Sequence, residues 1–438
     1  MNNSKNSSNI KTATIDFINF FVAEKFRECV RVKKMLFLLC IFMFSCSEKK
    51  DSGLYPVIDV VNNLGKYQRV YCSDLFSSIE LIPTETHEKC LIGNNPRPVI
   101  NDMVILMSGQ ESSHLYAFNR SGEYINLIAK KGQGPGEYYN LGNVFFNTDR
   151  QTIYILDIEK CLEYDLEGNH IRSFKISESN INTFDVISRI EYVGDSLFVG
   201  STRYNGTNKF KYCIFDQNGD IIKTFPNYIL FDRPNSGSSM SVKDFALDPI
   251  KVDNRIYLKD YINDTIYALS DLNIQPAYIF DFGSYSLSKA YLNDSFMEER
   301  FQNVINFMSL LGFPNYFFYK MYVTESFAQP KSEYPQPQAI YGLYDIAENK
   351  NILLDTDQYL QSGIINDING GLPFIPLCYA GNNEVVGLWL PDMMKEKLTD
   401  EYFASQTIKD QQGHQKLKEI LKNMNEDDNP VIVIAKLK

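Results

Sequence analysis

One short pattern recurs along this chain and limits its fold more than any other feature. An aromatic residue is followed by a polar residue, two variable residues, a glycine and a return to alternating apolar residues. The three clear copies are Phe118–Ile125, Tyr164–Ile171 and Phe215–Ile222. Glycine readily adopts the positive φ of a tight turn, and alternation with period two is typical of strands. The pattern therefore predicts a series of β-hairpins.

The spacing of these hairpins predicts a larger repeat. The turn glycines Gly122, Gly168 and Gly219 are 46 and 51 residues apart, and weaker copies follow at 269–273 and 343–349. Strand-like runs precede each turn, so a unit holds about four short strands, as a propeller blade does. Aromatic residues make up 13% of the chain, which favours strands over helices. A single blade buries neither face alone, so several blades must close into a ring.

The repeat units predict a six-bladed ring over residues 55–438. We expect five blades at 98–128, 144–176, 189–226, 246–281 and 317–354. A sixth would combine 374–391 with the apolar C-terminal strand Pro430–Leu437. An N-terminal strand, either Val57–Val61 or Ile79–Pro83, would pair with that strand, close the ring and remove its open edges. The predicted fold class is an all-β, six-bladed β-propeller.

Two segments depart from the alternating pattern and predict short helical insertions, at about 293–312 and 396–424. In the first, Ser295 and Glu298 are placed as a capping box, and apolar residues then recur at helical spacing as far as Leu311. The second has the same spacing at Leu417, Ile420, Leu421 and Met424. We expect both apolar stripes to pack against the propeller.

The N-terminal region has the features of a secretory signal. Met35–Ser45 contains no charged residue and follows three basic residues, and it is too short to span a bilayer as a helix. Residues 43–46 resemble the lipobox of bacterial lipoproteins, which implies cleavage before Cys46 and lipid attachment to its thiol. The alternative is a plain signal peptide in which Cys46 is incidental.

The first thirty residues fit a signal peptide poorly because they contain Asp16, Glu24 and Glu28. We therefore expect residues 1–45 to be a signal peptide with an upstream extension, and translation to start near Val32 or Met35. Residues 46–54 would then be the lipidated cysteine and a short polar tether.

The charge of the chain limits its partners. The net charge is −11, and removal of residues 1–45, with seven basic and three acidic side chains, changes it to −15. Such a chain lacks the basic excess that nucleic-acid binding requires, and anionic headgroups repel it. We expect no nucleic-acid partner and contact with the membrane through the lipid anchor only. The expected location is the outer membrane, on its periplasmic or cell-surface face.

A glycine-rich motif, KGQGPGEY, occupies residues 131–138. Its candidate residues are Gly132, Gly134, Pro135, Gly136, Glu137 and Tyr138. The motif lacks the ending of a phosphate-binding loop, and no helix pattern follows it. We expect an unusual backbone path between two blades, anchored by Glu137 and Tyr138. A ligand-binding loop is the alternative.

Several of these features together resemble one family. The lipobox, the KGQGPGEY motif, the YDLEG turn at 164–168 and the ending NPVIVIAKLK resemble a family of six-bladed β-propeller lipoproteins from gut-type Gram-negative bacteria. The resemblance covers most of residues 55–438. It implies an NHL-like propeller of largely unknown function, and the family offers no assigned catalytic residues to carry over.

Two aspartates are candidate metal ligands. Asp157 and Asp260 end the similar runs IYILD and IYLKD. Equivalent strand ends of a propeller converge on its axial channel, where carboxylate oxygens could hold a divalent cation such as Ca²⁺. The corresponding ends in the first and third blades are Ser108 and Ser201, so the ring of carboxylates is incomplete. We expect no cofactor, with axial Ca²⁺ as the alternative.

The sequence favours a binding protein over an enzyme. It has four histidines and neither a GxSxG elbow nor an HExxH motif. We expect a binding or scaffolding module for a glycan, a peptide or an envelope protein. The alternative is a propeller hydrolase or lyase with an axial divalent metal. A third hypothesis is a sensor or assembly partner of nutrient-uptake machinery.

Overall fold

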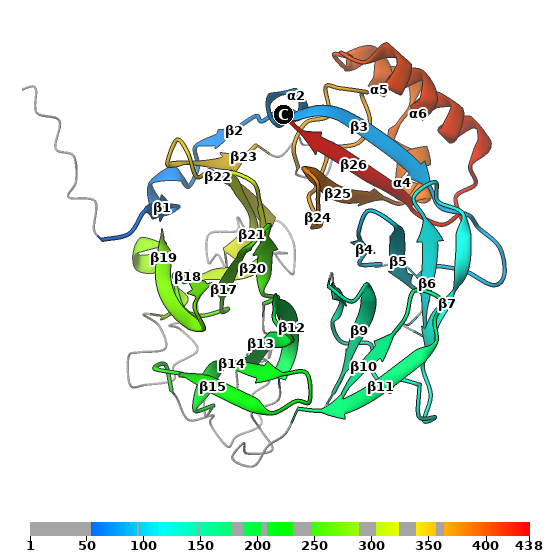
Figure 1. Ribbon diagram of the computed structural model, residues 1–438. Coiled ribbons are helices and arrows are strands. Elements are labelled where there is room, and N and C mark those ends of the chain that lie inside the picture. The colour runs from blue at the N-terminus through cyan, green and yellow to red at the C-terminus, as the bar shows by residue number, and fades with distance from the viewer. Residues whose placement is uncertain are drawn as a thin grey trace, which may run out of the picture. The chain divides into compact units, whose positions relative to one another are not determined.

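The repeated hairpins build six β-sheets around a common axis, so the predicted six-bladed propeller is confirmed (Figure 1). The chain is described from a computed structural model, in which residues 55–438 form one compact unit. The described residues are 54–93, 96–109, 111, 113–147, 149–158, 160–176, 187–202, 208–230, 247–288, 304–323, 339–355 and 363–438. The predicted signal peptide and Cys46 lie outside them.

The first three blades are four-stranded antiparallel sheets whose strands follow one another in the chain. Blade 1 consists of β4 (Val99–Ile100), β5 (Val104–Ser108), β6 (His114–Asn119) and β7 (Tyr124–Lys130). Blade 2 consists of β8 (Val144–Asn147), β9 (Thr152–Asp157), β10 (Lys160–Tyr164) and β11 (His170–Lys175). Blade 3 consists of β12 (Ile187–Gly194), β13 (Leu197–Thr202), β14 (Phe210–Asp216) and β15 (Ile221–Pro226).

The other three blades each include one strand from the N-terminal part of the unit. Blade 4 consists of β16 (Ile250–Val252), β17 (Arg255–Lys259), β18 (Thr265–Ser270), β19 (Asn273–Asp281) and β1 (Val57–Asp59). Blade 5 consists of β20 (Ile305–Phe313), β21 (Tyr316–Val323), β22 (Ala339–Asp345), β23 (Lys350–Leu354) and β2 (Tyr67–Gln68). Blade 6 consists of β24 (Cys378–Gly381), β25 (Glu384–Trp389), β26 (Val431–Leu437) and β3 (Phe76–Pro83).

The N-terminal segment runs along the outside of three successive blades. β1 pairs in parallel with β19, and β2 pairs in parallel with β23, so each adds a fifth strand to a complete blade. β3 pairs antiparallel with β26 and completes blade 6. The predicted closure by Ile79–Pro83 is therefore confirmed. The alternative closing strand, Val57–Val61, is wrong, because Val57–Asp59 pairs with blade 4 instead.

The turn glycines explain how the repeat also joins the blades. Gly122, Gly168 and Gly219 have φ values of 91°, 84° and 90°, which favour glycine. A Cβ on each would overlap a backbone carbonyl oxygen of the preceding blade's outermost strand. Those oxygens belong to Pro83, Leu127 and Lys175. Each glycine therefore permits both the turn and the close approach of the next blade.

One of the two predicted helical insertions is wrong over the described residues. Residues 305–312 of the predicted 293–312 helix belong to β20, and 293–303 lie outside the described residues. A register shift between Phe307 and Ser309 interrupts the strict alternation of β20. Ile305, Met308 and Leu311 follow one another at intervals of three in the sequence, which imitates a helix, but in the strand they pack into three different apolar clusters. β20 pairs with β21 from Ile305 to Phe313, so this segment is a strand.

The second helical insertion, predicted at about 396–424, is confirmed. It contains α4 (Pro391–Lys397), α5 (Asp400–Ser405) and α6 (Gln411–Asn423). Thr399 and Asp410 cap α5 and α6 by accepting hydrogen bonds from backbone N–H groups. Figure 1 shows α5 and α6 beside β3, on the outer side of blade 6. Three single-turn helices, η1 (Val61–Asn63), α2 (Cys72–Leu75) and η3 (Gly283–Tyr285), lie in connections.

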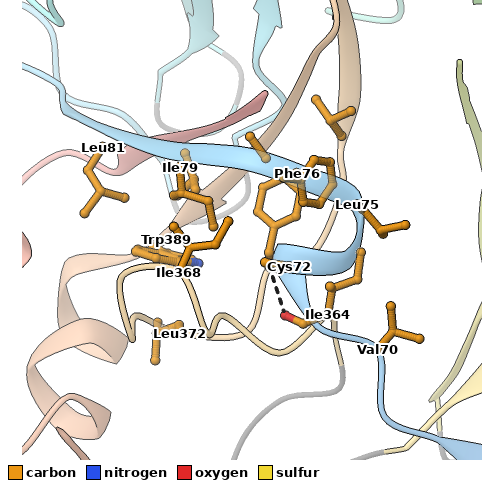
Figure 2. Close-up of a cluster of buried hydrophobic side chains, with 14 of the residues drawn as sticks. Val70, Cys72, Leu75, Phe76, Ile79, Leu81, Ile364, Ile368, Leu372 and Trp389 are labelled. Atoms are coloured by element: carbon orange, nitrogen blue, oxygen red, sulfur yellow. Dashed lines mark hydrogen bonds between the residues drawn. The ribbon is translucent and has the colours of Figure 1, made fainter. Parts of the chain in front are cut away.

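A large apolar cluster connects the N-terminal segment to the C-terminal helices (Figure 2). Phe76 lies edge-on to Phe374, with ring centroids 5.3 Å apart, and the Sγ of Cys72 donates to the carbonyl oxygen of Ile364. Leu417 of α6 and Trp389 of β25 are buried in the same cluster. The position of α6 beside β3 is thus set by core packing.

Candidate functional site

The glycine-rich loop joins blade 1 to blade 2. It closes on itself, because Gly132 N donates to the carbonyl oxygen of Tyr138 and Tyr138 N donates to that of Lys130. The side chain of Tyr138 is fully buried, whereas Pro135 is exposed at the tip. The two ends of the loop, Lys130–Gly132 and Tyr138, are therefore hydrogen-bonded to each other.

Glu137 folds its carboxylate back over the loop. Its Oε2 accepts a hydrogen bond from Gly134 N at 2.9 Å, and its Oε1 lies 3.2 Å from Lys130 Nζ. These two partners hold the pKa of Glu137 below its ordinary value. A Cβ at Gly132 would overlap the carboxylate, and one at Gly136 would lie 3.0 Å from His170 Cβ. A side chain at either position would therefore have to displace a neighbouring side chain.

Asp157 lies next to this loop, so the structure brings two separate sequence candidates together. Its carboxylate accepts hydrogen bonds from Tyr139 N at 3.0 Å and Asn140 N at 2.9 Å. Lys160 Nζ lies 3.6 Å from its Oδ2 and donates to the carbonyl oxygen of Glu137. Asp157 therefore anchors the chain as it leaves the loop.

Asp260 lies apart from them, between blades 3 and 4. Its Oδ1 accepts hydrogen bonds from Ile262 N and Asn263 N, and its Oδ2 lies 2.9 Å from Lys211 Nζ of β14. Burial alone would raise the pKa of Asp260, but the ammonium groups of Lys211 and Lys259 hold it below its ordinary value.

The two candidate metal ligands thus have matching surroundings. Asp157 and Asp260 each bind two backbone N–H groups and one lysine, so each negative charge is already balanced. Among the residues that the structure describes, no three His, Cys, Asp or Glu side chains gather as a metal site. The axial Ca²⁺ site stays a prediction, and a cation there would compete with Lys160 and Lys211.

Lys259 is a buried charged residue that the sequence analysis missed. Its ammonium donates to the carbonyl oxygens of Asp260 and Asn263 and lies 4.5 Å from the centroid of the Phe307 ring. Burial lowers its pKa to about 8. No alternation marks Lys259 in the sequence, because β17 is buried on both faces from Ile256 to Lys259.

A second charged cluster lies near the axis, between β12 and β16. Burial raises the pKa of Glu191 to about 7; the nearby Lys251 opposes this shift and Asp248 adds to it. Lys251 Nζ donates to the carbonyl oxygen of Tyr192, and Arg189 Nε lies 2.7 Å from Asp248 Oδ1. The cluster gives blades 3 and 4 a polar contact close to the axis.

A groove of about 590 Å³ lies between β3, α6 and the β6–β7 turn. Its apolar lining residues are Leu81, Ile82, Pro83, Ile420 and Met424. Its polar lining residues are Glu80, Arg120, Ser121, Lys416, Glu419, Asn423 and Asp428. These residues come from three distant parts of the chain, so no local motif marks the groove in the sequence. An apolar floor with a charged rim is typical of binding sites.

The propeller residues match a known protein family. Residues 55–436 match the model of a family described as a domain of unknown function, DUF4934. The chain belongs to this family. No curated protein matches this DUF4934 member in sequence. Among its described residues, no helix is long and apolar enough to cross a membrane.

Two solved structures from Bacteroides resemble this DUF4934 member. A protein of Bacteroides fragilis NCTC 9343, described as exported, is 18% identical, with a TM-score of 0.62 over 87% of this chain and 99% of that one. A DUF4221 member from Bacteroides vulgatus is 9% identical, with a TM-score of 0.46 over 83% and 97%. At this level of identity, the first likeness shows the fold alone.

Proposed function

We propose that this DUF4934 member is an exported, lipid-anchored propeller that binds a partner in the cell envelope through the groove between β3 and α6. The groove carries this proposal, because it combines an apolar floor with charged groups on two rigid elements. The partner classes expected from the sequence, a glycan, a peptide or an envelope protein, all remain candidates for this groove.

The proposed location of the protein in the cell envelope is supported by other observations than the groove. The lipobox-like residues 43–46 precede a polar segment, and one protein with a similar fold is described as exported. We propose attachment to the outer membrane through Cys46. In cells fed a labelled fatty acid, Cys46→Ser should remove the label from the protein, whereas Cys40→Ser inside the apolar signal should keep it. A label that persists in Cys46→Ser would contradict lipid attachment at that thiol.

Thermal unfolding of the mature protein tests the binding function. The candidate ligands are synthetic peptides, oligosaccharides and Ca²⁺, with EDTA as the metal-free control. A ligand at a hundred times its Kd adds about 2.7 kcal/mol to the stability and raises the unfolding temperature. Ser121→Trp should fill one end of the groove and abolish the increase. Glu167→Trp, at the equivalent turn position of blade 2, is the matched control and should keep it.

Two results would contradict this assignment. A ligand that stabilises wild type and Ser121→Trp equally binds outside the groove. A Ca²⁺-dependent increase that disappears when Asp157 and Asp260 are both replaced by Ala would favour the alternative, a hydrolase or lyase with an axial divalent metal.

A further inference from the structure

We infer that the groove binds long basic side chains, lysine or arginine, of a protein partner, with their charged ends at Glu80 and Glu419 and their apolar stems over Ile420. This inference rests on the proposed function and specifies the chemical class of the partner. Three observations support it: the carboxylates on the two walls, the balance of charge in the groove, and the apolar surface beside the carboxylates.

The backbone of β3 is not open to a partner, so recognition in the groove depends on side chains. Leu81, one of the lining residues, is 3% exposed. Pro83 has no N–H group, and Gly122 covers its carbonyl oxygen, because a Cβ at Gly122 would overlap that atom. The carbonyl oxygen of Gly122 in turn accepts a hydrogen bond from Glu85 N. A partner therefore contacts the side chains that line the groove.

Each wall of the groove carries an exposed carboxylate, that of Glu80 on β3 and that of Glu419 on α6. Among the residues that the structure describes, no hydrogen bond or ion pair engages either carboxylate. Both are therefore available to a basic group. Because they stand on different elements, two separate basic groups would meet them. This arrangement favours a partner with more than one basic side chain.

Asp428 adds a third negative charge to the lining, beyond the end of α6. Its Oδ2 accepts a hydrogen bond from Asn425 N at 2.7 Å. This bond fixes the carboxylate at the groove but does not neutralise it, because the donor is a backbone amide. The lining therefore holds three carboxylates from three parts of the chain.

The two basic residues of the lining do not balance these charges. The guanidinium of Arg120 is already engaged, because its Nη2 lies 2.7 Å from Glu384 Oε2 and its Nη1 donates to the carbonyl oxygen of Asn101. Lys416 is the other basic lining residue. The groove is therefore net negative, which favours a basic partner over an acidic one.

The apolar surface beside the carboxylates indicates a long side chain. Ile420 of α6 is half-buried and Pro83 of β3 is exposed, and both line the groove. Ile420 follows Glu419 on the stripe of α6 that also contains Lys416, so charge and apolar surface are adjacent. Lysine and arginine bury their methylene stems along apolar surface and keep the charged end free to pair. A neutral glycan would leave the carboxylates without a counter-charge.

Fluorescence anisotropy of the mature protein with labelled octapeptides tests the inference. The probes alternate glycine with lysine, with glutamate, or with diaminobutyric acid, which carries the charge of lysine on a stem two methylenes shorter. At pH 6.5 we expect the lysine peptide to bind, the short-stem peptide to bind about fivefold more weakly, and the glutamate peptide not to bind.

Paired variants place the binding in the groove. Glu419→Lys should weaken binding of the lysine peptide about tenfold, because it reverses one of the carboxylates. Glu401→Lys, the same change on α5, should leave Kd within about twofold. In Ile420→Ala, the lysine peptide should lose most of its advantage over the short-stem peptide, because the stem no longer contacts an apolar side chain.

The outcomes separate this inference from the proposed function. Equal binding of the lysine and short-stem peptides would overturn recognition of a long side chain. Equal effects of Glu419→Lys and Glu401→Lys would overturn charge recognition at the groove, leaving attraction by the acidic surface as a whole. An oligosaccharide that Ser121→Trp excludes, with no peptide binding, would overturn the inference and leave the proposed function standing. Peptide binding unchanged in Ser121→Trp would overturn both.

Discussion

The Nζ of Lys211 lies 2.9 Å from the Oδ2 of Asp260, and this ion pair joins blade 3 to blade 4. Both residues are buried. Removing one partner of a buried pair leaves the other charge without compensation, which is strongly destabilising. The pair therefore holds two neighbouring blades in register at a point where the sequence analysis expected a metal ligand.

Asp260→Asn should lower the free energy of unfolding by about 3 kcal/mol at pH 7, because Lys211 stays buried without its counter-charge. Urea denaturation measures this loss. Asp271→Asn, in an exposed turn of the same blade, is the control and should change the stability by less than about 0.5 kcal/mol. Equal losses in the two variants would show that the ion pair has no special role.

Lys259 should make the stability rise with pH. Its pKa is about 8 in the folded protein and 10.5 ordinarily, so between these values the unfolded chain binds more protons. Unfolding then becomes less favourable as the pH rises, by up to about 3 kcal/mol. The stability of wild type relative to Lys259→Met should increase from pH 8 to pH 10. Lys395→Met, on the exposed side of α4, should show no such trend.

Glu191 should have the opposite dependence at lower pH. Its pKa is raised from 4.5 to about 7 in the folded protein, so the folded state binds more protons between these values and loses stability as the pH rises through them. Glu191→Gln should therefore gain about 1–3 kcal/mol relative to wild type between pH 5 and pH 8. Denaturant titrations at both pH values measure the change, and Glu348→Gln is the exposed control. A constant difference across this range would contradict the assignment.

Gly132 and Glu137 should be energetically coupled. Gly132→Ala displaces the Glu137 carboxylate and should destabilise the protein by about 1 kcal/mol. In a Glu137→Ala background the space is empty, so the same substitution should cost little. A double-mutant cycle measured by urea denaturation reports the coupling. Additive effects would mean that the cost of a side chain at residue 132 does not come from the Glu137 carboxylate.

The sequence specified the ring because its repeat carries two constraints at once. Gly122, Gly168 and Gly219 set the hairpin turns and also permit contact with the preceding blade. Both constraints are local in sequence, so spacing alone indicated the blades. The helix expected at 293–312 is wrong over β20, because the helical spacing of its apolar residues in the sequence is overridden by strand pairing with β21.

The candidate sites were less predictable because they depend on contacts between distant residues. Asp157 and Asp260 looked equivalent from their similar runs, and both do bind two amides and a lysine. Their lysine partners, however, come from different places: Lys160 follows three residues later, whereas Lys211 belongs to another blade. The groove is assembled from residues 80–83, 120–121 and 416–428, so only the folded ring brings it together.

Hydrogen–deuterium exchange of the mature protein, with and without a ligand that raises its unfolding temperature, tests the central claim most directly. The account predicts slower exchange on ligand binding along residues 80–82 and 416–424, with no change in the loop at 131–138. Slower exchange in that loop or near Asp260, with β3 unchanged, would contradict the claim that the β3–α6 groove is the binding site.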